Sequence, residues 1–148
     1  MKVKLEVRPT GLSGKIGELV YCYDRRTGTI IARRYAYPKI TEHNRKVGSA
    51  SANLFKLNPS KGYKENLYFY VDRYNGLREN RNSRARSWVN IYLKMMYAMA
   101  KADPTLDLST LTREEIQQRE LPCLSLKRAI EAGLLPRVYG WEDFDKEI

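Results

Sequence analysis

The sequence is poor in the residues from which metal and redox sites are built. It has two cysteines, Cys22 and Cys123, and a single histidine, His43, in 148 residues. The cysteines are far apart and form no C-x-x-C or zinc-ligand spacing. We therefore expect no metal site. Both cysteines are predicted to be small buried side chains, and His43 is predicted to be a polar residue in the first turn of a helix.

Long apolar segments are also absent. No apolar run approaches the ~20 residues that a membrane-spanning helix needs. The first residues, "MKVKLEVRPTG", lack the apolar core of a secretory signal. These features predict a protein without membrane contact that stays in the cytoplasm, or inside a particle assembled there.

Catalytic motifs are missing as well. The sequence contains no P-loop, no G-x-G-x-x-G, no G-x-S-x-G and no H-E-x-x-H. "GLSGKIG" lacks the G-K-[ST] of a phosphate loop, and Glu114, Glu115 and Glu120 lie in a charged stretch without an apolar pocket. We therefore predict a protein that is not an enzyme, with no catalytic residue, no cofactor and no small-molecule substrate.

Charge is present in excess and is unevenly distributed. Residues 1–102 carry a net charge of +14 and residues 103–148 a net charge of −4, within a total of +10. This asymmetry predicts a basic domain over 1–102 and an acidic C-terminal segment over 103–148. Either the basic part meets a polyanion, or the acidic segment docks on a basic face of its own or a neighbouring subunit.

Hydrophobic periodicity predicts an α+β protein in which a small antiparallel sheet precedes three main helices. Residues 2–8 alternate as a strand does, and residues 18–24 and 29–36 form a hairpin around "DRRTG", with Gly28 left-handed. The third strand comes either from residues 2–8 or from a partner chain. The predicted helices begin after Thr41, after Ser60 and near Ser83; two short helices and an extended tail, 134–148, follow.

The hairpin interleaves arginine with tyrosine. Such a pattern can stack bases or grip phosphates. It is equally typical of tyrosines packing on strands and of arginines protecting a sheet edge in water. The candidate contact residues of the hairpin are Tyr21, Tyr23, Arg25, Arg26, Arg33 and Arg34.

A second basic cluster lies in "LRENRNSRARSW", residues 77–88, which we expect at the start of a helix. Cations there oppose the helix macrodipole, which favours an acidic partner over a chance distribution. A solvated face is the alternative. The candidate contact residues are Arg78, Arg81, Arg84 and Arg86.

The C-terminal tail is rich in apolar side chains that need a surface to cover. We expect these residues to form an assembly tail, docked either on their own chain or on a neighbour. The tail residues are Leu134, Val138, Tyr139, Trp141 and Phe144.

"SGKIGELVYCYDRRTGTIIARRY" resembles the N-terminal signature of a group of uncharacterised bacterial and prophage-type proteins. Their pattern is S-G-K-x-G, a short strand, a glycine turn and a second strand ending in arginine, followed by a helix with small residues. The resemblance covers residues 11–57, and Pro38-Lys39-Ile40-Thr41-Glu42-His43 departs from the group's N-P-x-T-x-x-Q. It implies a viral or prophage-like setting and no catalytic residue.

Together these features predict a structural assembly protein, a component of a phage-like particle, that contacts copies of itself or a neighbouring particle protein through hairpin and tail. The alternative is a nucleic-acid-binding protein without sequence preference, which uses the two arginine clusters.

Overall fold

The chain forms two compact units. We name residues Met1–Ile40 the sheet unit and residues Thr41–Ile148 the helical unit. The charge distribution predicted a boundary near residue 102 instead, but residues on both sides of that position share one hydrophobic core. The computed structural model describes residues 2–4, 13–24, 27–81 and 83–148.

The sheet unit is a four-stranded antiparallel sheet with the order β1-β4-β3-β2. The predicted hairpin is confirmed as β3 (Leu19–Asp24) and β4 (Thr29–Arg34). Gly28 closes its turn with a φ of 64°, and its amide donates to the Asp24 carbonyl oxygen at 2.8 Å. A left-handed backbone at this position favours glycine because it has no Cβ.

Two outer strands flank the hairpin. β1 (Lys2–Lys4) pairs with β4, so the chain itself supplies the third strand that was expected from 2–8; residues 5–8 lie outside the described part. β2 (Gly14–Ile16) pairs with β3 and was not predicted, because "GLSGKIG" indicated only a turning approach. Gly17, with a φ of 58°, lets the chain reverse between β2 and β3.

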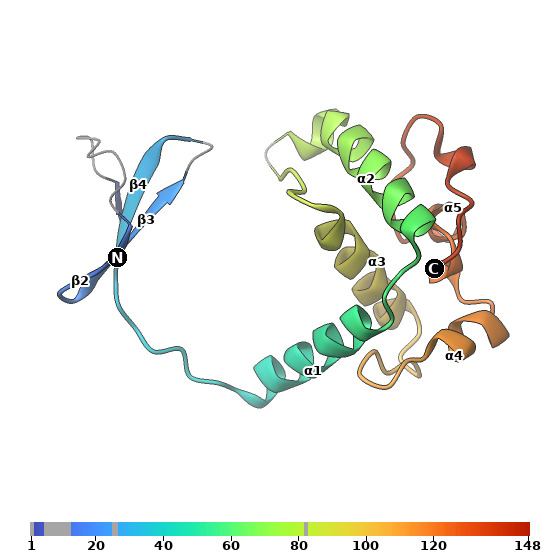
Figure 1. Cartoon of the computed structure of the whole chain (residues 1–148), viewed down its shortest axis with the longest axis horizontal. Coiled ribbons are helices and arrows are strands. Elements are labelled where there is room, and N and C mark those ends of the chain that lie inside the picture. Colours follow the sequence, from blue (N-terminus) through green and yellow to red (C-terminus); the bar gives the residue numbers. More distant parts are fainter. Residues whose placement is uncertain (1, 5–12, 25–26, 82) are drawn as a thin grey trace. The chain divides into compact units, whose positions relative to one another are not determined.

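The helical unit begins with two helices whose N-caps were predicted from sequence. α1 (Glu42–Lys56) follows Thr41, whose hydroxyl accepts from the Asn44 amide. α2 (Lys61–Gly76) follows Ser60, whose hydroxyl accepts from the Tyr63 amide. These side chains satisfy helix amides that would otherwise lack a partner. Figure 1 shows α2 and α3 side by side within this unit.

The third helix starts later than its sequence indicated. α3 (Trp88–Ala102) follows Ser87, whereas the sequence placed its start near Ser83. In the described residues 77–81 and 83–87, the chain forms a connection that contains the short 3₁₀ helix η1 (Arg78–Asn80). The Asn75 side chain holds Ala85 in this connection by donating to its carbonyl oxygen and accepting from its amide. Those bonds stabilise a non-helical path.

The remaining elements are short. Their bounds are α4 (Arg113–Gln118), η2 (Pro122–Leu124), α5 (Leu126–Glu131) and η3 (Trp141–Asp143). Of these, α5 packs against α2 and η2 against α3, while α4 contacts η2 and η3 contacts α5; the C-terminus lies beside α5 (Figure 1).

The hydrophobic core lies in the helical unit. It runs from Ala50 of α1 to Ile148 and includes Leu67, Tyr92 and Met95, which are fully buried. In the sheet unit, the hydrophobic residues that are buried among those described are Ile30 and Ala32. Nearly all the apolar burial that drives folding therefore belongs to the second unit.

Candidate functional site

The hairpin divides its candidate residues between two faces. Residues paired directly across an antiparallel ladder point to the same side of the sheet. Tyr21 pairs with Ala32 and Tyr23 with Ile30, so both tyrosines share a face; Leu19 pairs with Arg34 on that face. Arg33 pairs with Val20 on the opposite face. The pleat thus separates Arg33 from Arg34, while Arg25 and Arg26 lie outside the described residues.

One face of the sheet is apolar and largely open. We name it the Tyr23 face. Around buried Ile30 and Ala32, exposed large side chains gather, including Ile16 at 57% and Tyr23 at 41% exposure. Ile16 joins this face because it pairs with Leu19. The residues of the Tyr23 face are Ile16, Leu19, Tyr21, Tyr23, Ile30, Ala32 and Arg34.

The opposite face is more polar. The Lys15 ammonium lies 4.1 Å from the centroid of the Tyr35 ring, a cation–π contact. Tyr35 in turn meets Tyr37 edge to face, with ring centroids 5.1 Å apart. The exposed Cys22 thiol also belongs to this face, because Cys22 pairs with Ile31. The prediction that both cysteines are buried is therefore wrong for Cys22.

The second arginine cluster precedes α3 rather than occupying its first turn. Arg78 lies in η1, and Arg81, Arg84 and Arg86 follow it in the connection. The macrodipole argument for these arginines was therefore wrong, since its effect is confined to the first turn of a helix. Their side chains are exposed, and none of the ion pairs among described residues involves them.

The C-terminal tail docks on its own chain. Val138 and Phe144 are buried in the helical core, and Leu134 and Trp141 pack against it. Of the two alternatives that the sequence left open, docking on the same chain or on a neighbour, these four residues show docking on the same chain. Tyr139 is the exception, with 90% of its surface exposed.

Hydrogen bonds fix the tail to α2 and η2. The Tyr70 hydroxyl donates to the Pro136 carbonyl oxygen at 2.8 Å, and the Arg73 guanidinium donates to the Tyr139 carbonyl oxygen at 2.6 Å. Near the end of the chain, the Ile148 amide donates to the Leu124 carbonyl oxygen at 3.0 Å. The tail is therefore an integral part of the helical unit.

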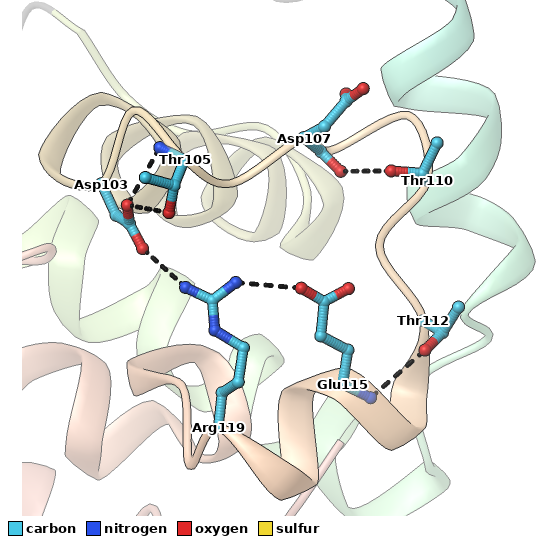
Figure 2. Close-up of polar contacts among 7 residues, drawn as sticks. All are labelled: Asp103, Thr105, Asp107, Thr110, Thr112, Glu115 and Arg119. Atoms are coloured by element: carbon cyan, nitrogen blue, oxygen red, sulfur yellow. Dashed lines mark hydrogen bonds and ion pairs between the residues drawn. The ribbon is translucent and has the colours of Figure 1, made fainter.

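The acidic residues after α3 are engaged within their own segment. Figure 2 shows Arg119 between two carboxylates, with its guanidinium 2.9 Å from both Asp103 and Glu115. Asp103 also accepts from the hydroxyl and the amide of Thr105, and these bonds, with Arg119, hold the pKa of its carboxyl below the usual range. These acids do not pair with Arg84 or Arg86 in the described structure, so they do not neutralise the charge of that cluster.

Buried titratable groups in the helical core have a structural role. The Tyr63 hydroxyl donates to the Cys123 carbonyl oxygen at 2.9 Å, and desolvation by burial raises the pKa of Tyr63 well above its ordinary value. Burial also raises the pKa of the Cys123 thiol to about 12, which keeps it protonated and unreactive at neutral pH. No group of three or more His, Cys, Asp or Glu side chains gathers at metal-binding distance in the described part of the chain.

A cavity of about 380 Å³ lies where the arginine cluster meets α2 and α3. Arg84 and Arg86 line it, as the sequence indicated for a contact site, together with Lys94 and Tyr74, which sequence reasoning missed. A signal for Lys94 was present, because it is the single charged residue between Trp88 and Ala100 in an otherwise apolar helix.

Comparisons of the chain with models of protein families, with curated proteins and with solved structures find no match. Among the described helices, none has both the length and the apolar character needed to cross a bilayer.

Proposed function

We propose that this protein is a structural assembly protein that associates with copies of itself through the Tyr23 face of its sheet. The proposal rests on one observation. On that face, exposed apolar side chains surround two buried residues, Ile30 and Ala32. A sheet gains stability by burying one face against a second layer. Ile16, Leu19 and Tyr23 remain exposed in the described part of the single chain.

A second copy is the partner that this face fits. Sheets pack face to face in aligned sandwiches, and a two-fold axis lets one apolar face meet its own equivalent. The Tyr23 face includes no Asp or Glu among its described residues, and Arg34 lies at the end of β4. Apolar contact at its centre with arginine at the margin is the usual composition of a protein interface.

Repeated self-contact suits a component of a phage-like particle, which is the setting that the resemblance of residues 11–57 implies. A two-fold contact through the Tyr23 face joins two subunits, and in a particle it would be one of several kinds of contact that together stabilise the assembly. In this proposal the tail completes each subunit, and the sheet makes the contact between subunits.

The test is the oligomeric state of full-length variants, measured by size-exclusion chromatography with light scattering. We expect the wild-type protein to form dimers or larger species as its concentration rises. Tyr23→Glu places a charge on the proposed interface and should yield a monomer. Cys22→Glu is the matched control, because it adds the same charge at an exposed neighbouring position on the opposite face, and it should associate as the wild type does.

Two outcomes would overturn this proposal. One is a wild-type protein that stays monomeric at every concentration, which would leave the Tyr23 face without a self-partner. The other is equal loss of association in Tyr23→Glu and Cys22→Glu, which would indicate a general effect of charge rather than contact through one face.

A further inference from the structure

A cavity in the helical unit lies between α2, the connection that precedes α3, and α3 itself. Its volume is about 380 Å³, and its walls come from three separate stretches of the chain. The residues that matter for its chemistry are Tyr74, Arg84, Arg86, Asn90, Ile91 and Lys94.

The wall that carries the arginines has a fixed backbone. The Asn75 side chain donates to the Ala85 carbonyl oxygen at 2.9 Å and accepts from the Ala85 amide at 2.8 Å. Asn80 adds a bond from its side-chain amide to the Tyr74 carbonyl oxygen at 3.0 Å. Arg84 and Arg86 flank Ala85, so these bonds hold the two arginines beside the cavity. A site positioned in this way loses less entropy when it binds a ligand.

The opposite wall supplies a positioned lysine. The Lys94 ammonium donates to the Tyr74 hydroxyl at 2.7 Å and lies 4.8 Å from the centroid of the Tyr74 ring. Tyr74 is itself buried. An ammonium has three donors, and the bond to Tyr74 uses one of them. The remaining donors of Lys94 are available to a ligand in the cavity.

The cavity has a strong and uncompensated positive charge. Two guanidinium groups and one ammonium line it, and no carboxylate does. Three other arginines of the helical unit are engaged: Arg119 and Arg128 pair with carboxylates, and Arg73 binds backbone carbonyl oxygens. Arg84 and Arg86 have no such partner among the described residues.

We propose that this cavity binds a phosphate group. Arginine forks match the oxygens of a phosphate in bidentate fashion, and lysine binds phosphate as a point charge. The phosphate can belong to a polynucleotide backbone or to a small phosphorylated molecule, since both present the same oxygens. The site lies wholly in the helical unit, so this proposal does not depend on self-association of the sheet.

The experiment measures binding of two probes to the full-length protein at low and at moderate salt. The first probe is a fluorescein-labelled oligo(dT), followed by anisotropy. The second is inorganic pyrophosphate, followed by titration calorimetry. Binding of either probe through the cavity supports the proposal. Oligo(dT) alone identifies a nucleic-acid backbone as the source of the phosphate, and pyrophosphate alone identifies a small molecule.

Matched double variants separate the cavity from general basicity. Arg84→Gln/Arg86→Gln removes two charges from the cavity wall, and Arg78→Gln/Arg81→Gln removes two from the same basic stretch outside the cavity. We expect the first pair to weaken binding about tenfold or more and the second pair to change it by no more than about threefold. Lys94→Gln keeps a donor for the Tyr74 hydroxyl but removes the charge, and it should weaken binding as well.

Equal weakening by the two double variants would overturn the proposal, because it would show a diffuse basic surface without a site. Absence of binding of both probes at low salt would overturn it too. All the exchanged arginines are exposed in the structure, so a loss of folding is not expected to obscure the result.

Discussion

The sheet unit and the helical unit are organised by opposite uses of apolar surface. The helical unit buries a large apolar core within one chain, down to the final residue, Ile148, although Phe55 and Phe69 stay exposed on its surface. The sheet unit leaves Ile16 and Tyr37 largely exposed and Tyr23 41% exposed, and its buried hydrophobic residues, among those described, are Ile30 and Ala32. A folded domain needs a face on which two layers meet. The helical unit thus has a core of its own, and under our proposal a second copy of the chain completes the sheet unit.

The strongest way to test this comparison is to delete residues 134–148. Four of the deleted residues are buried: Leu135, Val138, Phe144 and Ile148. Their burial contributes roughly 1.5–3 kcal/mol each, a total comparable to the whole stability of a domain. We expect the shortened chain to lose cooperative unfolding, measured by circular dichroism on heating.

Tyr139→Ala in the full-length chain is the control for this deletion, since Tyr139 lies in the same segment but is exposed. It should unfold as the wild type does. A shortened chain that still unfolds cooperatively, but no longer associates, would show that the tail serves neighbours rather than its own unit.

A pair of leucine variants compares the two units directly. Leu67→Ala empties a fully buried position on α2 and should lower the free energy of unfolding by ~2–5 kcal/mol. Leu19→Ala makes the same exchange on the Tyr23 face, where Leu19 is 37% exposed. Measured on dilute protein, it should change the unfolding of the helical unit by less than about 0.5 kcal/mol.

The comparison of Leu67→Ala with Leu19→Ala becomes more informative when the denaturant titration is repeated at high protein concentration. Leu19→Ala should then become destabilising relative to the wild type, because association stabilises only the folded state. If Leu19→Ala lowers the free energy of unfolding as much in dilute protein as in concentrated protein, the sheet already has a covering layer within one chain.

Local signals in the sequence were enough for much of this architecture. The N-caps Thr41 and Ser60 and the turn glycine Gly28 act within a few residues, and the elements they bound were predicted correctly. The start of α3 was not predicted correctly. The bonds between Asn75 and Ala85 connect positions ten residues apart, and such bonds produce no periodic pattern in the sequence. β2 was missed because its short sequence, Gly-Lys-Ile, has no alternation to detect.

The candidate site was predictable in composition but not in geometry. The arginine cluster was evident, whereas its pairing with Lys94 and Tyr74 depends on how α2 packs against α3. The aromatic composition of the tail indicated that its side chains would be buried against some surface. Only the fold shows that this surface includes Tyr70, Leu124 and their neighbours in the same chain. Sequence periodicity indicates which apolar side chains need to be buried, but it does not indicate which surface those side chains contact.

A smaller effect is expected from a single buried hydroxyl of the helical core. Tyr63→Phe removes the donor to the Cys123 carbonyl oxygen, and both residues are fully buried. An unsatisfied buried acceptor costs ~1–3 kcal/mol, which denaturant titration should detect. Tyr139→Phe removes an exposed hydroxyl and should leave stability unchanged. Equal small losses for the two variants would indicate that solvent reaches Cys123.

The smallest expected effect is a dependence of helical-unit stability on pH, through Asp103. Bonds from the Thr105 hydroxyl and amide, and then the Arg119 guanidinium, lower the pKa of Asp103 in the folded chain. The folded state therefore binds this proton less tightly than the unfolded state does. Its stabilising contribution is complete above the unfolded pKa of about 4 and is lost as the pH falls through the lower, folded value.

Asp103→Asn removes this titration and should flatten the melting temperature between pH 5 and 2 relative to the wild type, as followed by circular dichroism. Because Asp103 and Arg119 are both partly exposed, the difference will be small and should shrink further in high salt. Arg119→Gln isolates the contribution of the ion pair, since Thr105 still donates to Asp103 in that variant. If Asp103→Asn follows the same acid melting curve as the wild type, then the contacts in Figure 2 do not distinguish the folded from the unfolded carboxyl.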